Sequence, residues 1–137
     1  MELDEITEEV VETSIAIHRA LGPGLLESVY GLVLTASLQR RGLRVQHQLP
    51  VSFTYDGMFF EHAFRADLVV EGCVAVEVKS LEKLAHVHMK QLLTYLRLLD
   101  LHVGLLLNFG AGTMREGLRR VVNDLDPSMS PGLRVNR

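Results

Sequence analysis

Two consecutive segments with alternating apolar and polar residues constrain the fold of this chain most strongly. In VAVEVKS, residues 74–80, valine occupies positions 74, 76 and 78, and Glu77 and Lys79 occupy the alternate positions. Successive side chains of a strand point to opposite faces, so this segment is predicted to be a strand with one apolar and one charged face. The charged face is compatible both with a solvated sheet edge and with a catalytic pair.

The preceding segment, RADLVV, carries a single acid, Asp67, among apolar residues. If the three residues EGC between the segments form a hairpin loop, Val70 pairs with Val74 and Asp67 pairs with Glu77. A two-residue turn would instead place the two acids on opposite faces of the sheet. The three-residue loop also gathers six apolar side chains on the other face: Ala66, Leu68, Val70, Val74, Val76 and Val78.

The expected pairing of Asp67 with Glu77 has a chemical consequence. Directly opposed side chains have Cβ atoms about 4.5–5.5 Å apart, and two carboxylates that close repel unless a proton or a cation lies between them. Mg²⁺ prefers oxygen ligands, could polarise a phosphoryl oxygen and could supply a hydroxide, while Lys79 would orient that water or stabilise developing charge. In the alternative, Lys79 and Arg65 neutralise the two acids at a solvated edge.

The remaining pattern predicts a mixed α/β protein. Helices are expected over residues 4–21, 25–41 and 86–99, and strands over 44–54, 58–70, 73–79 and 103–109. The order of helix, helix, three strands, helix and strand predicts a mixed sheet with an antiparallel three-stranded meander flanked by helices.

The end of the chain is less regular. Residues 113–122 are compatible with an edge strand or a short helix. We expect a single domain over residues 1–126 and, because proline and glycine are frequent at the end, a loose C-terminal tail over residues 127–137.

Composition argues against several classes of protein. No apolar run approaches the ~20 residues that a membrane helix needs, and the acidic N-terminus does not have the pattern of a secretory signal. Cys73 is the only cysteine, which excludes an intrachain disulfide and is consistent with a cytoplasmic protein. The net charge of −3 argues against a protein that coats nucleic acid nonspecifically.

Two helical motifs add candidate site residues. GLLESVY places Glu27 and Tyr30 three positions apart at the start of the second helix, and QLLTY places Gln91 and Tyr95 four positions apart. Both pairs therefore lie on one helix face. His88, three positions before Gln91, could line the same site. Alternatively, Glu27 interacts only with the helix dipole, and the other motif is a polar stripe facing water.

Together these motifs resemble the PD-(D/E)XK nuclease superfamily, in particular its branch with a Q-x-x-x-Y helix, which includes exonucleases that act on DNA ends. LGPGLLESVY, FRADLVV, VEVKS and QLLTYLRLL resemble more closely the small GxxExxY protein family, over residues 4–123. The resemblance implies a restriction-endonuclease-like core, which has the element order expected above. Ala66 stands where the superfamily name has proline.

The resemblance also implies roles for individual residues. Asp67 and Glu77 would bind Mg²⁺, with Mn²⁺ as a possible substitute, and Glu27 would be the helical acid that assists the metal or its water. Lys79 would be the catalytic lysine. Gln91 and Tyr95 would position the lysine, the metal site or a substrate phosphate.

The expected function is therefore Mg²⁺-dependent hydrolysis of phosphodiester bonds, with DNA as the expected substrate. Two alternatives use the same fold: a nucleic-acid-binding or scaffolding subunit without turnover, and a metal-dependent hydrolase of nucleotides or other phosphate esters. Because so small a chain has little surface beyond its core with which to grip DNA, we expect a homodimer. A further protein partner is left open.

Overall fold

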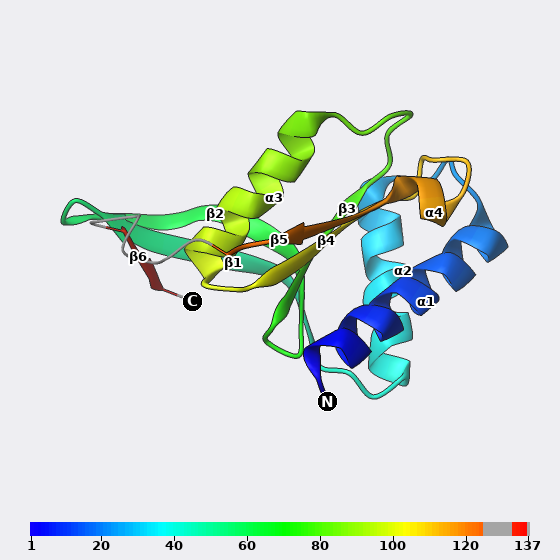
Figure 1. The fold of residues 1–137 in the computed structure, drawn as a ribbon, viewed down its shortest axis with the longest axis horizontal. Helices are drawn as coiled ribbons and strands as arrows, with labels where there is room; N and C mark the ends of the chain where they lie inside the picture. The colour runs from blue at the N-terminus through cyan, green and yellow to red at the C-terminus, as the bar shows by residue number, and fades with distance from the viewer. Residues whose placement is uncertain (125–132, 137) are drawn as a thin grey trace.

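A computed structural model describes residues 1–124 and the backbone of residues 133–136. Its centre is a six-stranded mixed sheet in the order β5-β4-β3-β2-β1-β6, with helices on both faces (Figure 1). The elements follow one another as α1 (Leu3–Leu21), α2 (Glu27–Arg40), β1 (Val45–Tyr55), β2 (Met58–Val70), β3 (Val74–Lys79), α3 (His86–Leu99), β4 (Val103–Asn108), α4 (Met114–Gly117), β5 (Leu118–Val122) and β6 (Leu133–Asn136). The predicted fold class and element order up to β4 are confirmed.

The two ends of the sheet extend the predicted core. Residues 113–122, which were compatible with a helix or a strand, contain both: the short helix α4 leads directly into the edge strand β5. At the opposite edge β6 pairs antiparallel with β1, from Ser52 with Asn136 to Tyr55 with Leu133. The expected loose tail is therefore wrong for residues 133–136, and the rest of residues 127–137 lies outside the described residues. The open edge of β1 offers unpaired N–H and C=O groups, which a chain end can satisfy.

The hairpin between β2 and β3 has the predicted register. Val70 pairs with Val74 and Leu68 with Val76, so the loop consists of three residues. Glu71 (φ 52°) and Gly72 (φ 67°) both adopt left-handed backbone conformations, which let so short a loop reverse the chain. This register is the one that keeps Asp67 and Glu77 on the same face.

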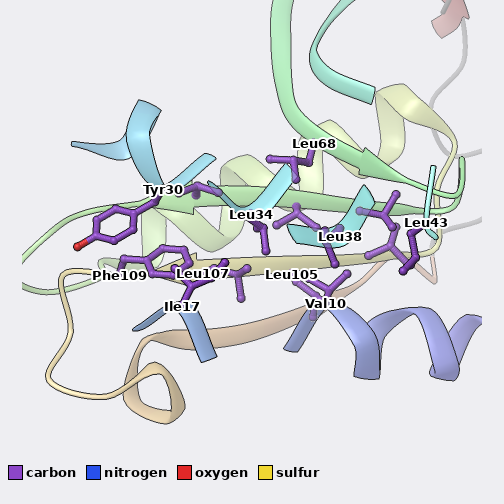
Figure 2. Packing of buried hydrophobic residues seen from close by; sticks show 14 of the residues in the cluster. Val10, Ile17, Tyr30, Leu34, Leu38, Leu43, Leu68, Leu105, Leu107 and Phe109 are labelled. Carbon is purple, nitrogen blue, oxygen red and sulfur yellow. The ribbon is translucent and has the colours of Figure 1, made fainter. Parts of the chain in front are cut away.

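Each face of the sheet carries its own core. The first lies between the sheet and the α1–α2 pair, and Figure 2 shows Leu34 and Leu38 of α2 packed over Leu105 and Leu107 of β4. The second lies under α3, with Leu92, Leu96 and Leu99 among its members. A fully buried leucine contributes about 1.5–3 kcal/mol, so each helix layer is fixed firmly to the sheet.

The long β1–β2 hairpin changes sides along its length. Leu68 belongs to the core under α1 and α2, but Ala66, two positions earlier in β2, belongs to the core under α3. The expectation that Ala66 shares a face with Leu68 is therefore wrong. The change coincides with Gln48, which has a left-handed backbone (φ 54°) between the pairs His47–Leu68 and Leu49–Ala66. Asp67 lies opposite Gln48, at the point where β2 changes from one core to the other.

Within residues 1–124 and 133–136, none of the helices has both the length and the apolar character needed to cross a membrane.

Candidate active site

Asp67 and Glu77 lie where the regular pairing of β2 with β3 ends. The paired positions stop at Leu68–Val76, and two hydrogen bonds from the backbone to carboxylates follow. The N–H of Asp67 donates to Oε1 of Glu77 at 3.3 Å, and the N–H of Val78 donates to Oδ2 of Asp67 at 2.9 Å. The two acids therefore hold the strands together and lie beside each other, as the register predicts.

The environment of this acid pair disfavours two full negative charges. Glu77 is only 7% exposed, whereas Asp67 is partly exposed. Burial and then the negative charge of Asp67 raise the pKa of Glu77 to about 8, while the positive charge of Lys79 acts in the opposite direction. In the absence of a cation, the pair therefore holds a proton at neutral pH, which a metal ion would replace.

The oxygen atoms of the pair fit a hard divalent cation. One oxygen of each carboxylate is held by a backbone N–H, which leaves Oδ1 of Asp67 and Oε2 of Glu77 as candidate metal ligands. The side-chain amide of Gln48 approaches Oδ1 of Asp67 at 3.5 Å and orients it. Two carboxylates are enough for Mg²⁺, which keeps several waters and often binds a substrate phosphate as well.

Glu27, the expected third acid, is placed differently. It is the first residue of α2 and is exposed. Among residues 1–124 and 133–136, no group of three or more histidine, cysteine, aspartate or glutamate side chains is close enough together to hold a metal ion. The structure thus brings Asp67 and Glu77 together but does not gather Glu27 into a three-residue cluster with them.

The loop before Glu27 is nevertheless fixed to the site. The hydroxyl of Tyr30 donates to the carbonyl of Gly22 and accepts the N–H of Leu25 at 3.2 Å. The hydroxyl of Ser80, which follows Lys79, donates to the carbonyl of Leu25 at 2.7 Å. The segment that leads into α2 therefore touches the segment that leaves β3.

Tyr30 itself has a structural position. It is fully buried, and its ring stacks on Phe109 with centroids 4.4 Å apart and an interplanar angle of 8° (Figure 2). The tyrosine of the GLLESVY motif thus anchors the loop that carries Glu27 rather than pointing into the acid pair.

Lys79 ends β3 on the same face as Glu77 and is partly exposed. Its neighbour in the parallel strand β4 is Asn108. Asn108 is 2% exposed; its amide oxygen accepts the N–H of Leu81 at 2.8 Å, and its amide nitrogen donates to the carbonyl of Leu81 at 2.9 Å. These two hydrogen bonds fix the loop directly after Lys79.

The QLLTY motif lies on α3, above the face that carries the acid pair. Tyr95 stacks on Phe64 with ring centroids 4.1 Å apart. Burial, followed by the negative charges of Glu77 and Asp67, raises the pKa of Tyr95, so its hydroxyl keeps its proton and is available as a donor. Gln91 lies one turn earlier on the same helix and is exposed.

His88 makes capping hydrogen bonds at the start of α3, and its lining of the site stays a prediction. The ring Nδ1 of His88 accepts a hydrogen bond from the backbone N–H of Ala85 at 3.0 Å. The backbone N–H of His88 donates to the carbonyl of Ala85 at 3.1 Å. His88 therefore caps the start of α3.

Several supporting residues escape prediction from sequence. Asn108 gives the clearest signal, because a polar residue that ends an apolar strand needs buried hydrogen-bond partners. Gln48, Phe64 and Ser80 give none, since their contacts join segments far apart in the chain.

Comparison with known proteins agrees with this geometry. Neither the curated proteins nor the solved structures include a significant match to the chain. A family model described as the PD-(D/E)XK nuclease superfamily matches residues 4–121, a range that includes the acid pair, Lys79 and the QLLTY helix. The chain belongs to the PD-(D/E)XK nuclease superfamily.

Proposed function

We propose that this protein is a Mg²⁺-dependent nuclease that hydrolyses phosphodiester bonds in DNA. The observation that carries the proposal is the buried Glu77 beside Asp67, with Lys79 two residues further along the same strand face. Membership of a nuclease superfamily supports phosphodiester hydrolysis as the reaction. The choice of metal and of DNA is our inference from the carboxylate ligands and from the resemblance of the motifs.

In this proposal Asp67 and Glu77 hold the metal ion, and Glu27 acts on it through water. Mg²⁺ bound there would supply positive charge to the phosphoryl oxygens and would make its bound water more acidic. The ammonium group of Lys79 stabilises the charge that develops on the phosphate. Tyr95 and Gln91 donate hydrogen bonds from α3 and hold the phosphate in position.

The test is cleavage of labelled single-stranded, double-stranded and branched DNA with Mg²⁺ or Mn²⁺. The wild type is compared with Lys79→Ala, and Lys83→Ala is the matched control because Lys83 is exposed in the following loop. We expect cleavage by the wild type and by Lys83→Ala, and a loss of about 10²–10³-fold in Lys79→Ala. Equal cleavage by Lys79→Ala, or none by the wild type on any DNA or RNA, would contradict the proposal.

We also propose that the protein acts as a homodimer. The outward face of α2 exposes Leu26 (72%), Val29 (36%) and Leu32 (58%) at three-residue spacing. Burying these apolar side chains against a second copy would remove them from water. The dimer would also offer a larger surface for contact with DNA than one chain does. Light scattering at micromolar protein should give twice the chain mass for the wild type and the monomer mass for Leu32→Glu. A monomeric wild type would refute the dimer.

A further inference from the structure

A cavity lies outside the acid pair, next to the loop between α1 and α2. It is an open cavity of about 640 Å³ between the end of α1, the glycine–proline loop that follows it, and the segment that begins α4. Figure 1 shows α4 beside the end of α1 and the loop that leads to α2. The lining residues are Ile15, His18, Arg19, Gly22, Pro23, Gly112, Thr113, Met114 and Arg115.

The charge of this lining is entirely positive. Arg19 and Arg115 contribute two guanidinium groups, and no acidic residue is among the lining residues. Within residues 1–124, neither arginine takes part in an ion pair or a side-chain hydrogen bond, whereas Arg41 and Arg44 are each paired with glutamate. Two unpaired guanidinium groups beside one cavity suit an anion, and phosphate oxygens match their geometry particularly well.

The remaining walls are apolar and fixed. Ile15 and Pro23 offer carbon surface, which suits a flat ring or a sugar rather than a bare ion, while Met114 is almost completely buried. His18 is only 7% exposed, and its Nε2 forms a hydrogen bond of 2.8 Å with the carbonyl of Ala111, which joins α1 to the segment before α4. The volume falls within the range of about 300–1,000 Å³ that is usual for small-molecule sites.

The cavity and the acid pair lie at one edge of the sheet. Strands β3 and β4 are parallel, and their last residues, Lys79 and Asn108, are paired. The acid pair lies at the end of β3, and the cavity is built partly from the residues that follow β4. Ligands of open α/β sheets bind outside the carboxyl ends of the strands, and both places lie at that end of the sheet.

We propose that this cavity binds one nucleotide unit. Arg19 and Arg115 bind its phosphate, and Ile15 and Pro23 pack against its base or sugar. The unit is either part of a nucleic-acid strand that also occupies the acid pair, in which case the inference rests on the proposed nuclease function, or a free nucleotide. Both have the same nucleoside phosphate chemistry, and the experiment separates them.

The experiment compares Arg19→Gln/Arg115→Gln with Arg40→Gln/Arg41→Gln. The control also removes two positive charges, but from the C-terminal end of α2. That end lies away from the cavity, which is near the loop before α2 (Figure 1). All four arginines are exposed, so both variants should fold, and their melting temperatures verify this. Binding of a fluorescent single-stranded oligonucleotide and of free dAMP is measured in EDTA, where metal-dependent cleavage cannot occur.

We expect the cavity variant to bind the oligonucleotide at least about tenfold more weakly than the control variant, because it loses two charge-assisted phosphate contacts. If the loss affects dAMP instead, the occupant is a free nucleotide. Equal affinities of the two variants for both ligands would overturn the proposal.

The outcome is independent of the nuclease test. If the wild type cleaves DNA but the cavity variant binds and cleaves like the control, the cavity proposal fails and the nuclease proposal stands. If no DNA is cleaved but nucleotide binding depends on the two arginines, the nuclease proposal fails and the cavity proposal stands.

Discussion

The two faces of β3 bury side chains of opposite character, valines on one side and an acid on the other. Val74, Val76 and Val78 are almost completely buried under α1 and α2. On the opposite face Glu77 is equally inaccessible, but it lies beside another acid, and its pKa is raised to about 8. Burial lowers the free energy of the folded state on the first face and raises it on the second. An acid pair with one buried member that disfavours its own ionisation suits a functional site, because a cation or a proton relieves the repulsion.

Substitution on the charged face should produce the largest effect. We expect Glu77→Gln to reduce metal-dependent cleavage about 10³-fold, or about 4 kcal/mol in activation free energy, because it removes a proposed metal ligand. The same change should raise the melting temperature in EDTA at pH 8, since it removes a buried charge beside Asp67. Single-turnover cleavage and thermal unfolding measure the two effects. If Glu77→Gln lost stability and kept activity, the comparison of the two faces would be wrong.

The metal-free protein should lose stability as the pH rises. Burial and the negative charge of Asp67 raise the pKa of Glu77 to about 8 in the folded state, against 4.5 for an unperturbed glutamate. Because the folded state binds the proton more tightly, its stability is full below pH ~4.5 and falls by a few kcal/mol as the pH rises to ~8. Chemical unfolding in EDTA across this range should show the decline in the wild type. Glu77→Gln should not show it, and an equal decline in both proteins would assign the effect to other groups.

Substitution on the apolar face should have the opposite character. Val76→Ala removes two methyl groups from a fully buried position and should cost about 2 kcal/mol of unfolding free energy. Cleavage per folded molecule should stay within about twofold of the wild type, because the acid pair keeps its backbone hydrogen bonds. Urea unfolding and active-site titration check these values. A large loss of cleavage without a loss of stability would contradict the division between the faces.

Tyr95→Phe should give the smallest effect. The ring keeps its stacking on Phe64, and the variant loses only the hydroxyl near the acid pair. Removing one hydrogen-bond donor to the substrate should lower kcat/KM about tenfold and leave stability almost unchanged. Tyr55→Phe is the matched control, because Tyr55 is exposed at the tip of the β1–β2 hairpin. Equal activity of the two variants would show that the hydroxyl of Tyr95 does not contribute to cleavage.

Local patterns predicted the part of the fold that local geometry determines. The alternation in VAVEVKS and the three-residue loop are sufficient to define the register of β2 with β3, and hence to bring Asp67 beside Glu77. The helical spacing in QLLTY likewise predicts that Gln91 and Tyr95 share a helix face.

The features that the sequence did not reveal depend on distant segments. Strand β6 forms because β1 leaves an edge open, and Ala66 changes face because Gln48, opposite Asp67, has a left-handed backbone. Asn108 fixes the loop after Lys79 from another strand. The position of Glu27 depends on the anchored loop before α2, whose contacts with Tyr30 and Ser80 no local pattern encodes.

The most direct test of the account is calorimetric titration of Mg²⁺ into the wild type, Asp67→Asn and Glu77→Gln at pH 7, in buffers of different ionisation enthalpy. The account predicts one ion per chain in the wild type, with release of the proton that Glu77 holds, and little binding in either variant. No binding by the wild type at millimolar Mg²⁺, or equal binding by the variants, would contradict the claim that this acid pair is a metal site.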